Sequence, residues 1–315
     1  MDGDIGERGP RLSERLGRPP RRLLLLGGGA AVLAVLVDRG LRLDLPQPPP
    51  PVPTRRKAPD EDLLLSVVAD LSVLVTAADD LVSAGAGGTV RRVRTVLREQ
   101  RRVLTGRLTN AGVPSSVIAA AEKKAAAAAP PVRTRADLAA RLADVPRTRW
   151  AQVAEATADT RSLLLAALSA QIAGSALLGA DVAVPDPASP SRPTIVARTQ
   201  PLVYAFEVVA AQAGAEDRGR AADTLAGLTR LEIATSGTSP TMPSGWALPF
   251  PVTTPADASR LAHEVLADSV DATVEVAGTA PNAASVEDAA RWAARIQALA
   301  VDWDVPLTAF PGATP

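Results

Sequence analysis

Hydrophobic residues recur every three to four positions along most of the chain, the period of an amphipathic α-helix. The pattern is clearest over residues 60–84, where the apolar positions are Leu64, Val67, Val68, Leu71, Leu74, Val75, Ala78, Leu81 and Val82. It predicts a first helix there, ended by Gly85, and a second helix over residues 89–111. The second helix carries five arginines opposite its apolar face: Arg91, Arg94, Arg98, Arg101 and Arg102. Such a row is most often a solvated helix face, although it could meet an anionic membrane or polymer.

Three further helices complete a first set. An alanine-rich helix is predicted to reach residue 129. Thr134 and Asp137 have the spacing of a capping box and predict a helix that ends before Pro146. A single long helix is predicted over residues 147–178. We therefore expect an N-terminal helical bundle over residues 60–180.

A proline-rich linker over residues 181–193 separates this set from a second one. Beyond the linker the pattern predicts four helices, at about residues 200–213, 217–235, 255–277 and 286–303. Two of them have capping signals at their start, Thr254-Pro255 with Asp257 and Ser285 with Asp288. A long connection rich in proline and glycine separates the second helix from the third. Two helices, a long crossover and two more helices form the topology of a ferritin-like four-helix bundle, expected here over residues 194–315.

The N-terminal part has a different pattern. Residues 1–22 form a basic region with six arginines, and an uncharged apolar run then fills residues 23–37, from Leu23 to Val37. As a helix this run would span roughly 22 Å, short of the roughly 30 Å hydrocarbon core of a bilayer. Its length and its charged flanks predict an export signal or a membrane-anchor segment.

Arg21 and Arg22, followed by leucines, resemble a twin-arginine export signal, with Pro20 in place of the usual polar residue before the pair. A cleaved signal and an uncleaved anchor remain alternatives. Residues 38–59 form a proline-rich, semi-rigid spacer that would hold the folded part away from the membrane. We therefore expect an exported or membrane-anchored protein, with its folded part outside the cytoplasm and its membrane contact at Leu23 to Val37.

The amino-acid composition excludes several kinds of binding and catalytic site. The 34 basic and 34 acidic residues balance, so net charge gives no reason to expect a nucleic-acid partner. The chain has no cysteine and one histidine, His263, which excludes thiolate sites, disulfides and multi-histidine metal sites. Gly-x-Ser-x-Gly and phosphate-loop motifs are absent from the sequence.

Two short motifs carry a family resemblance. The segment Trp246-Ala-Leu-Pro-Phe-Pro-Val252 lies on the crossover, and Thr308-Ala-Phe-Pro-Gly312 lies near the end of the chain. Together with Val203-Tyr204-Ala205-Phe206 on the first helix of the second set, they resemble a ferritin-like domain of unknown function from exported bacterial proteins. The resemblance covers roughly residues 194–315 well and residues 60–180 more loosely.

This resemblance implies a di-iron or di-manganese site, but its ligands are replaced. Ferritin-like sites use carboxylates and Glu-x-x-His pairs, and no Glu-x-x-His occurs in the sequence. Where the family shows Glu-His before its aromatic segment, this chain has Thr199-Gln200, and Pro201 next to them is expected to disturb a helix. In the first set the equivalent place starts at Gln171. We therefore expect no metal or other cofactor, with Glu207 and Glu232 as weak candidate ligands if metal is found.

The other candidate residues have structural interpretations. Five acids of the third helix share one face and are expected to face water: Asp257, Glu264, Asp268, Asp271 and Glu275. His263 lies beside that face and is expected at the surface. Five large aromatic residues could line a ligand pocket or pack the crossover segment Trp246 to Val252, called the strap below, against the bundle. They are Trp246, Phe250, Trp292, Trp303 and Phe310.

These observations favour a metal-free scaffold or binding module of the cell envelope, with an unidentified envelope protein as partner and no catalytic residue. Two alternatives stay open. One is a ferritin-like metal-dependent oxidase with a carboxylate-only site at Glu207 and Glu232. The other is a protein that binds a small apolar ligand at the aromatic end of the second bundle.

Overall fold

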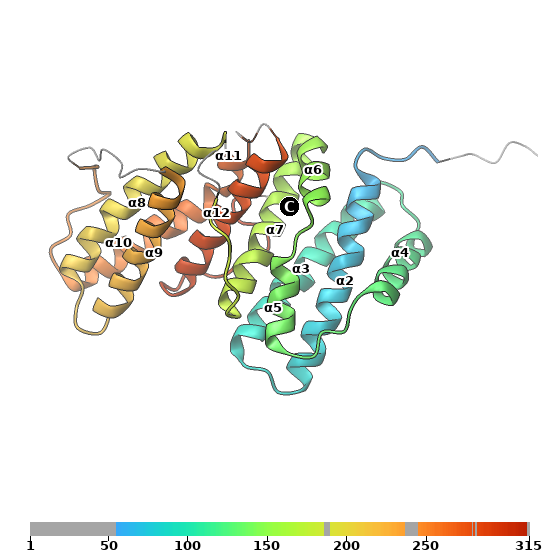
Figure 1. Cartoon of the computed structure of the whole chain (residues 1–315), viewed down its shortest axis with the longest axis horizontal. Helices are drawn as coiled ribbons and strands as arrows, with labels where there is room; N and C mark the ends of the chain where they lie inside the picture. The colour runs from blue at the N-terminus through green and yellow to red at the C-terminus, as the bar shows by residue number, and fades with distance from the viewer. Residues whose placement is uncertain (1–54, 186–189, 237–244, 279, 281, 314–315) are drawn as a thin grey trace, which may run out of the picture. The chain divides into compact units, whose positions relative to one another are not determined.

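The computed structural model describes residues 55–185, 190–236, 245–278, 280 and 282–313 (Figure 1). All regular structure in these residues is helical, in eleven helices without a strand, so the all-α prediction is confirmed. Residues 57–315 form one compact unit. The predicted basic region, the apolar segment and most of the spacer lie outside the described residues. Among the helices that are described, none combines the length and the apolar character needed to cross a bilayer.

The first four helices follow the predicted pattern closely. They are α2 (Glu61–Ser83), α3 (Gly88–Asn110), α4 (Ser115–Ala128) and α5 (Arg135–Ala143). Helix α2 packs against each of the other three, and its periodic apolar residues are buried. The capping box at the start of α5 is confirmed, because Thr134 Oγ1 accepts from the amide of Asp137 at 3.1 Å. Helix α4 buries only Ile118, so most of its alanine-rich surface is exposed or half-exposed.

The prediction of one long helix over residues 147–178 is wrong. The structure has two helices, α6 (Arg147–Glu155) and α7 (Ala158–Leu177), with extended backbone at Ala156 between them. The carboxylate of Asp60 accounts for the break. It accepts from the amide of Thr157 at 3.0 Å and from the hydroxyl of Thr157 at 2.6 Å. The amide of Thr157 therefore donates to a side chain and not to a backbone carbonyl of the preceding turn, as it would in a continuous helix.

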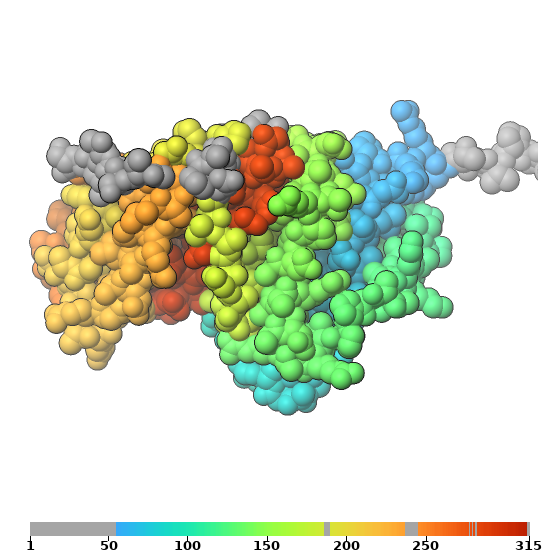
Figure 2. Space-filling model, viewed as in Figure 1, coloured from blue at the N-terminus to red at the C-terminus, as the bar shows by residue number. Residues whose placement is uncertain are grey.

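The second set comprises α8 (Arg192–Gln212), α9 (Arg218–Ser236), α10 (Pro255–Asp271), α11 (Thr273–Gly278) and α12 (Ala283–Val301). Helix α8 packs against α9 and α10, and α12 contacts both of these helices. Helix α9 lies on the face of the molecule seen in Figure 2, in orange. The buried apolar residues of these helices belong to the same continuous core as those of the first set.

Three boundaries in this set differ from the predictions. Helix α8 begins eight positions before Gln200 and continues through Pro201, so the expected disturbance at that proline does not end the helix. The ring removes only one backbone hydrogen bond, because proline has no N–H to donate to Ala197. The third predicted helix is divided at Ala272 into α10 and α11. Helix α12 is capped by Asn282, whose side chain accepts from the amide of Ser285 at 3.0 Å, so Ser285 lies inside the helix.

Helix α7 is buried on nearly all sides. It contacts α3, α5 and α6, and its contact with α12 is the most extensive between any two described helices (Figure 1). An unbroken run from Leu163 to Ser175 is buried, which is typical of a helix surrounded by others. Residues 186–189 of the predicted linker lie outside the described residues, and the division of the chain at 181–193 stays a prediction.

Candidate functional site

A chain of hydrogen-bonded amides fills the interior between α3 and α7. Gln100 on α3 is fully buried, and its Nε2 donates to the carbonyl oxygens of Ala167 and Ala309, both at 2.9 Å. Its Oε1 accepts from Nε2 of Gln171 on α7, also at 2.9 Å. These three hydrogen bonds join uncharged groups, and they satisfy the polar atoms of Gln100 that would otherwise be costly to bury.

The C-terminal motif forms one end of this chain of amides. Ala309 belongs to the segment from Thr308 to Gly312, so Gln100 of α3 holds the tail of the protein against the helices of the first set. Gly312 of the same segment packs against the C-terminal end of α10. Its φ is +65°, and a Cβ placed on it would lie 2.1 Å from the carbonyl oxygen of Asp271. Only glycine fits this approach of the tail to the end of α10.

Further buried polar contacts link α12 to its neighbours. Gln297 Nε2 donates to Ser169 Oγ of α7 at 3.2 Å, and Trp292 Nε1 donates to Thr199 Oγ1 of α8 at 3.1 Å. Thr199 Oγ1 in turn donates to the carbonyl of Ile195 at 2.7 Å. The two places where the family resemblance predicts metal ligands, at Gln171 and at Thr199, are therefore both occupied by neutral hydrogen bonds.

The two weak metal candidates lie in different environments. Glu232 on α9 is buried, with 4% of its surface exposed, and Glu207 on α8 is exposed. Burial raises the pKa of the Glu232 carboxyl, a hydrogen bond from Gln200 opposes the rise, and the charge of Glu207 adds to it. The second oxygen of Glu232, Oε1, has no hydrogen-bond partner among the described residues. Within the described parts of the chain, no three His, Asp or Glu side chains are grouped so that they could hold a metal ion.

The acidic face of the third predicted helix lies at the surface. Asp268, Asp271 and Glu275 are exposed, whereas Glu264 and Asp257 are half-buried. Asp257 completes the capping box that Thr254 forms at the start of α10, and Glu275 forms an ion pair with Arg198 of α8. His263 is also exposed, and its Nδ1 lies 2.8 Å from the carbonyl oxygen of Trp303.

The arginine row of α3 is largely ion-paired. Arg94 and Arg98 both pair with Asp79 of α2, Arg101 pairs with Glu122 of α4, and Arg102 pairs with Glu99 of its own helix. These acids offset much of the positive charge that the sequence pattern places on this face.

The five aromatic candidates are divided between the core and the strap. Trp292, Trp303 and Phe310 are buried, and Trp303 packs edge-on against Phe206 with ring centroids 5.6 Å apart. Trp246 and Phe250 are half-buried on the strap. Trp246 lies 5.7 Å from the ring of Tyr204, and the guanidinium of Arg260 lies 3.6 Å from the ring of Phe250.

A groove of about 300 Å³ lies where the strap meets α8 and α10. Trp246, Leu248 and Pro249 of the strap line it, together with Pro201 and Leu202 of α8 and Val265 of α10. Of the five aromatic candidates, Trp246 alone lines this groove.

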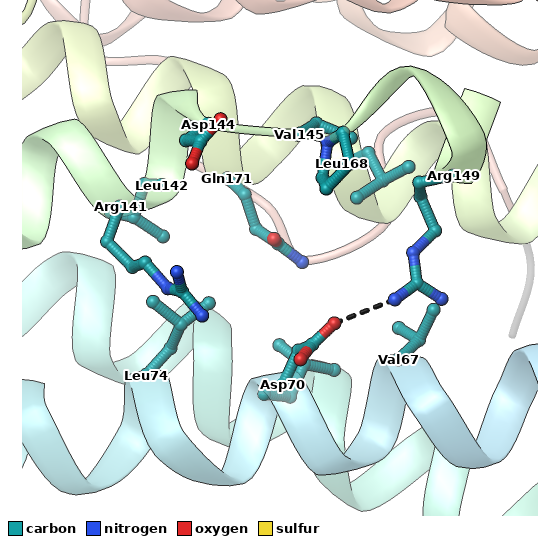
Figure 3. Close-up of a pocket in the computed structure, with 12 residues that line it drawn as sticks. Val67, Asp70, Leu74, Arg141, Leu142, Asp144, Val145, Arg149, Leu168 and Gln171 are labelled. Carbon is teal, nitrogen blue, oxygen red and sulfur yellow. Dashed lines mark hydrogen bonds and ion pairs between the residues drawn. The ribbon is translucent and has the colours of Figure 1, made fainter. Parts of the chain in front are cut away.

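A second cavity, of about 150 Å³, lies among α2, α5, α6 and α7 (Figure 3). Its apolar lining is Val67, Leu71, Leu74, Leu142, Val145, Pro146 and Leu168. Asp70, Arg141, Arg149 and Gln171 direct their polar ends toward the same space, and Asp144 lies at its rim. Gln171 thus belongs both to this cavity and to the buried amide chain.

The charged groups of this cavity are unequally paired. The side chain of Arg149 is 13% exposed, and its Nη2 lies 2.7 Å from Oδ2 of Asp70. Burial lowers the pKa of the Arg149 guanidinium, whereas the charge of Asp70 and its hydrogen bond act in the opposite direction. Arg141, in contrast, forms no ion pair or hydrogen bond with any residue of the described ranges, although it points into the cavity (Figure 3).

Sequence reasoning did not identify this cavity. Asp70, Arg141 and Arg149 come from three helices, and Asp144 directly follows α5. Asp70 and Arg149 are separated by 79 positions along the chain. The available signal was local: Asp70 directly precedes the buried Leu71, and Arg149 directly precedes the buried Trp150. Neither signal indicates a partner on another helix.

Comparison with protein-family models, with curated proteins and with solved structures gives no match for this chain.

Proposed function

We propose that the chain is an exported or membrane-anchored helical protein of the cell envelope that acts as a scaffold or binding module without a metal centre. The observation that carries this proposal is the buried amide chain of Gln100 and Gln171. A di-metal ferritin-like site needs carboxylates and imidazoles that converge on the interior. Here two neutral amides bond to each other and to backbone carbonyls instead.

The ferritin-like character of residues 194–315 is part of the proposal. It is supported by the mutual contacts of α8, α9, α10 and α12 and by the long connection between α9 and α10. The two sequence motifs support it as well, because the strap packs on Tyr204 and the tail packs on α10. A bundle with this interior can present surfaces to a partner but offers little for redox chemistry.

Export is tested with the full chain fused to a reporter that is active only outside the cytoplasm. Replacing both Arg21 and Arg22 by lysine preserves charge but removes the paired guanidinium groups of a twin-arginine signal. We expect this variant to lose external reporter activity. A matched variant with lysine at Arg15 and Arg18 should retain it. Equal external activity in both variants would contradict the twin-arginine assignment, and no external activity in the unmodified fusion would contradict export.

The groove beside Trp246 favours one second candidate function, the binding of a small apolar ligand. Proline, leucine and tryptophan side chains line it, as in many ligand pockets. An environment-sensitive apolar dye tests this function in the full chain. Saturable binding that Trp246→Ala abolishes and Trp150→Phe preserves would support it, whereas unsaturable or unchanged binding would contradict it.

A further inference from the structure

Asp70 and Arg141 of the cavity in Figure 3 have hydrogen-bonding capacity that the described residues do not use. Asp144, at the rim, is a second acid without a described side-chain partner. Asp70 accepts from Arg149 through Oδ2, and no described group donates to its Oδ1. The guanidinium of Arg141 has five N–H donors and no bonded partner in the described ranges. The cavity therefore has an acceptor and a donor that are available for a ligand.

Gln171 adds a third polar group with a fixed orientation. Its Nε2 donates to Gln100, so the side-chain amide cannot rotate without breaking the buried chain. No described group donates to the carbonyl oxygen of that amide, which therefore remains as an acceptor on a residue that lines the cavity. Asp70 and Gln171 thus provide acceptors for a ligand ammonium group, whereas Arg141 provides donors for a ligand carboxylate.

Apart from Asp144 at the rim and Arg149, which pairs with Asp70, the rest of the lining is apolar. Leu71 and Leu74 come from α2, Leu142 from α5 and Leu168 from α7. A cavity of this size, about 150 Å³, accommodates an apolar group of about six carbons. The cavity can hold an aliphatic side chain together with a small charged head group.

We infer that this cavity binds a small zwitterion, an α-amino acid with an aliphatic side chain. Its carboxylate pairs with Arg141, its ammonium group bonds to Asp70 Oδ1 and the Gln171 carbonyl, and its side chain contacts the leucines. A simple carboxylic acid fits less well, because it leaves Oδ1 of Asp70 without a donor and adds a negative charge to a cavity that already holds the carboxylates of Asp70 and Asp144. A simple amine fits less well, because it leaves Arg141 unpaired.

Isothermal titration calorimetry on the full chain tests this inference with three probes that share one side chain. They are L-leucine, 4-methylpentanoate, which lacks the ammonium group, and 3-methylbutylamine, which lacks the carboxylate. We expect saturable binding of leucine at one site. Each truncated probe should bind about tenfold more weakly or worse, because a charge-assisted hydrogen bond is lost.

Two protein variants locate the site. Arg141→Gln removes the unpaired cation and should weaken leucine binding by about tenfold or more. Arg147→Gln is the matched control, since Arg147 is exposed and does not line the cavity. It should bind leucine as the unmodified chain does. Circular dichroism checks that both variants retain their helices.

Three results would overturn the inference: no heat of binding with leucine at millimolar concentration, equal binding by the Arg141→Gln variant, or binding of 4-methylpentanoate as tight as that of leucine. The first two reject the site, and the third rejects the zwitterion. None of them bears on metal content or export, so this inference and the proposed function can fail separately.

Discussion

Gln100 Nε2 donates a hydrogen bond to the carbonyl oxygen of Ala309 at 2.9 Å, although 209 positions separate the two residues in the chain. The bond joins the middle of α3 to the C-terminal segment beyond α12. Because the same Nε2 also donates to Ala167 of α7, one buried side chain links three parts of the molecule. The interior of this protein is therefore held by amides as well as by apolar packing.

Replacing Gln100 by methionine should destabilise the protein by about 2–4 kcal/mol. Methionine matches the length of glutamine, so the main effect is to leave two carbonyls and the amide of Gln171 without a partner in the interior. Denaturant unfolding of the full chain measures the change. Gln152→Met is the control, because Gln152 is exposed on α6. A loss as small as that of the control, below about 0.5 kcal/mol, would show that the amide chain contributes little.

Gly312→Ala should lower the free energy of unfolding by about 1–3 kcal/mol. The new methyl group must avoid the carbonyl oxygen of Asp271, and alanine is strained at a φ of +65°. The control is Gly219→Ala on α9, where no atom would lie within 4 Å of the new Cβ. That change should stabilise the protein by about 0.5–1 kcal/mol. If both variants are stabilised, the tail does not pack on α10 as described.

Glu232→Gln should stabilise the protein at neutral pH, by about 1 kcal/mol. Burial raises the pKa of the Glu232 carboxyl above its ordinary value of 4.5, so the folded state favours the protonated form. The protonated Glu232 carboxyl therefore contributes most to the free energy of unfolding below pH 4.5, and this contribution is lost as the pH rises through the raised pKa. The difference in melting temperature between the Glu232→Gln variant and the unmodified chain should become smaller as the pH is lowered. Melting temperatures over this pH range measure it.

Glu216→Gln serves as the control for Glu232, because Glu216 is exposed. It should leave the melting temperature nearly unchanged at each pH. A Glu232→Gln variant that is less stable than the unmodified chain at neutral pH would contradict the prediction. It would indicate that the Glu232 carboxylate has a cationic partner, as the metal-dependent alternative requires.

Asp60→Asn should destabilise the protein at neutral pH by about 0.5–1.5 kcal/mol, because charge-assisted bonds to Thr157 become neutral ones. Burial by itself raises the pKa of the Asp60 carboxyl, but hydrogen bonds from Thr157 and Thr160 outweigh it and hold the pKa below its ordinary value of 3.8. The stabilisation is therefore present above pH 3.8 and is lost as the pH falls through the lowered pKa.

Asp62→Asn is the matched control for Asp60, since Asp62 forms an exposed pair with Lys57 that contributes little. Urea unfolding at neutral and at acid pH separates the two variants. Equal stability of both at neutral pH would show that the Asp60 carboxylate does not stabilise the junction of α6 and α7.

Local signals predicted most helices of this fold. The apolar period identified α2 and α3, and the capping boxes at Thr134 and Thr254 located the starts of α5 and α10 within one residue. The break between α6 and α7 could not be predicted in this way. It depends on Asp60, which lies 97 positions before Thr157 and becomes its neighbour only in the folded chain.

The same distinction applies to the candidate sites. The sequence pattern places Glu207 and Glu232 on successive predicted helices, and in the structure the charge of Glu207 acts on the Glu232 carboxyl. It gave no indication that Asp70, Arg141 and Arg149 surround one cavity, because their meeting depends on how α2, α5 and α6 pack. Periodicity identifies which face of a helix is buried but not which helix covers it.

Elemental analysis of the full chain, purified after growth with iron, manganese and zinc, tests the central claim most directly. We predict far less than stoichiometric metal in a well-folded helical protein, because Gln171 and Thr199 make neutral hydrogen bonds at the two places where metal ligands are expected. About two metal ions per chain, lost in the Glu207→Gln or Glu232→Gln variant, would contradict the claim and support a carboxylate-only oxidase.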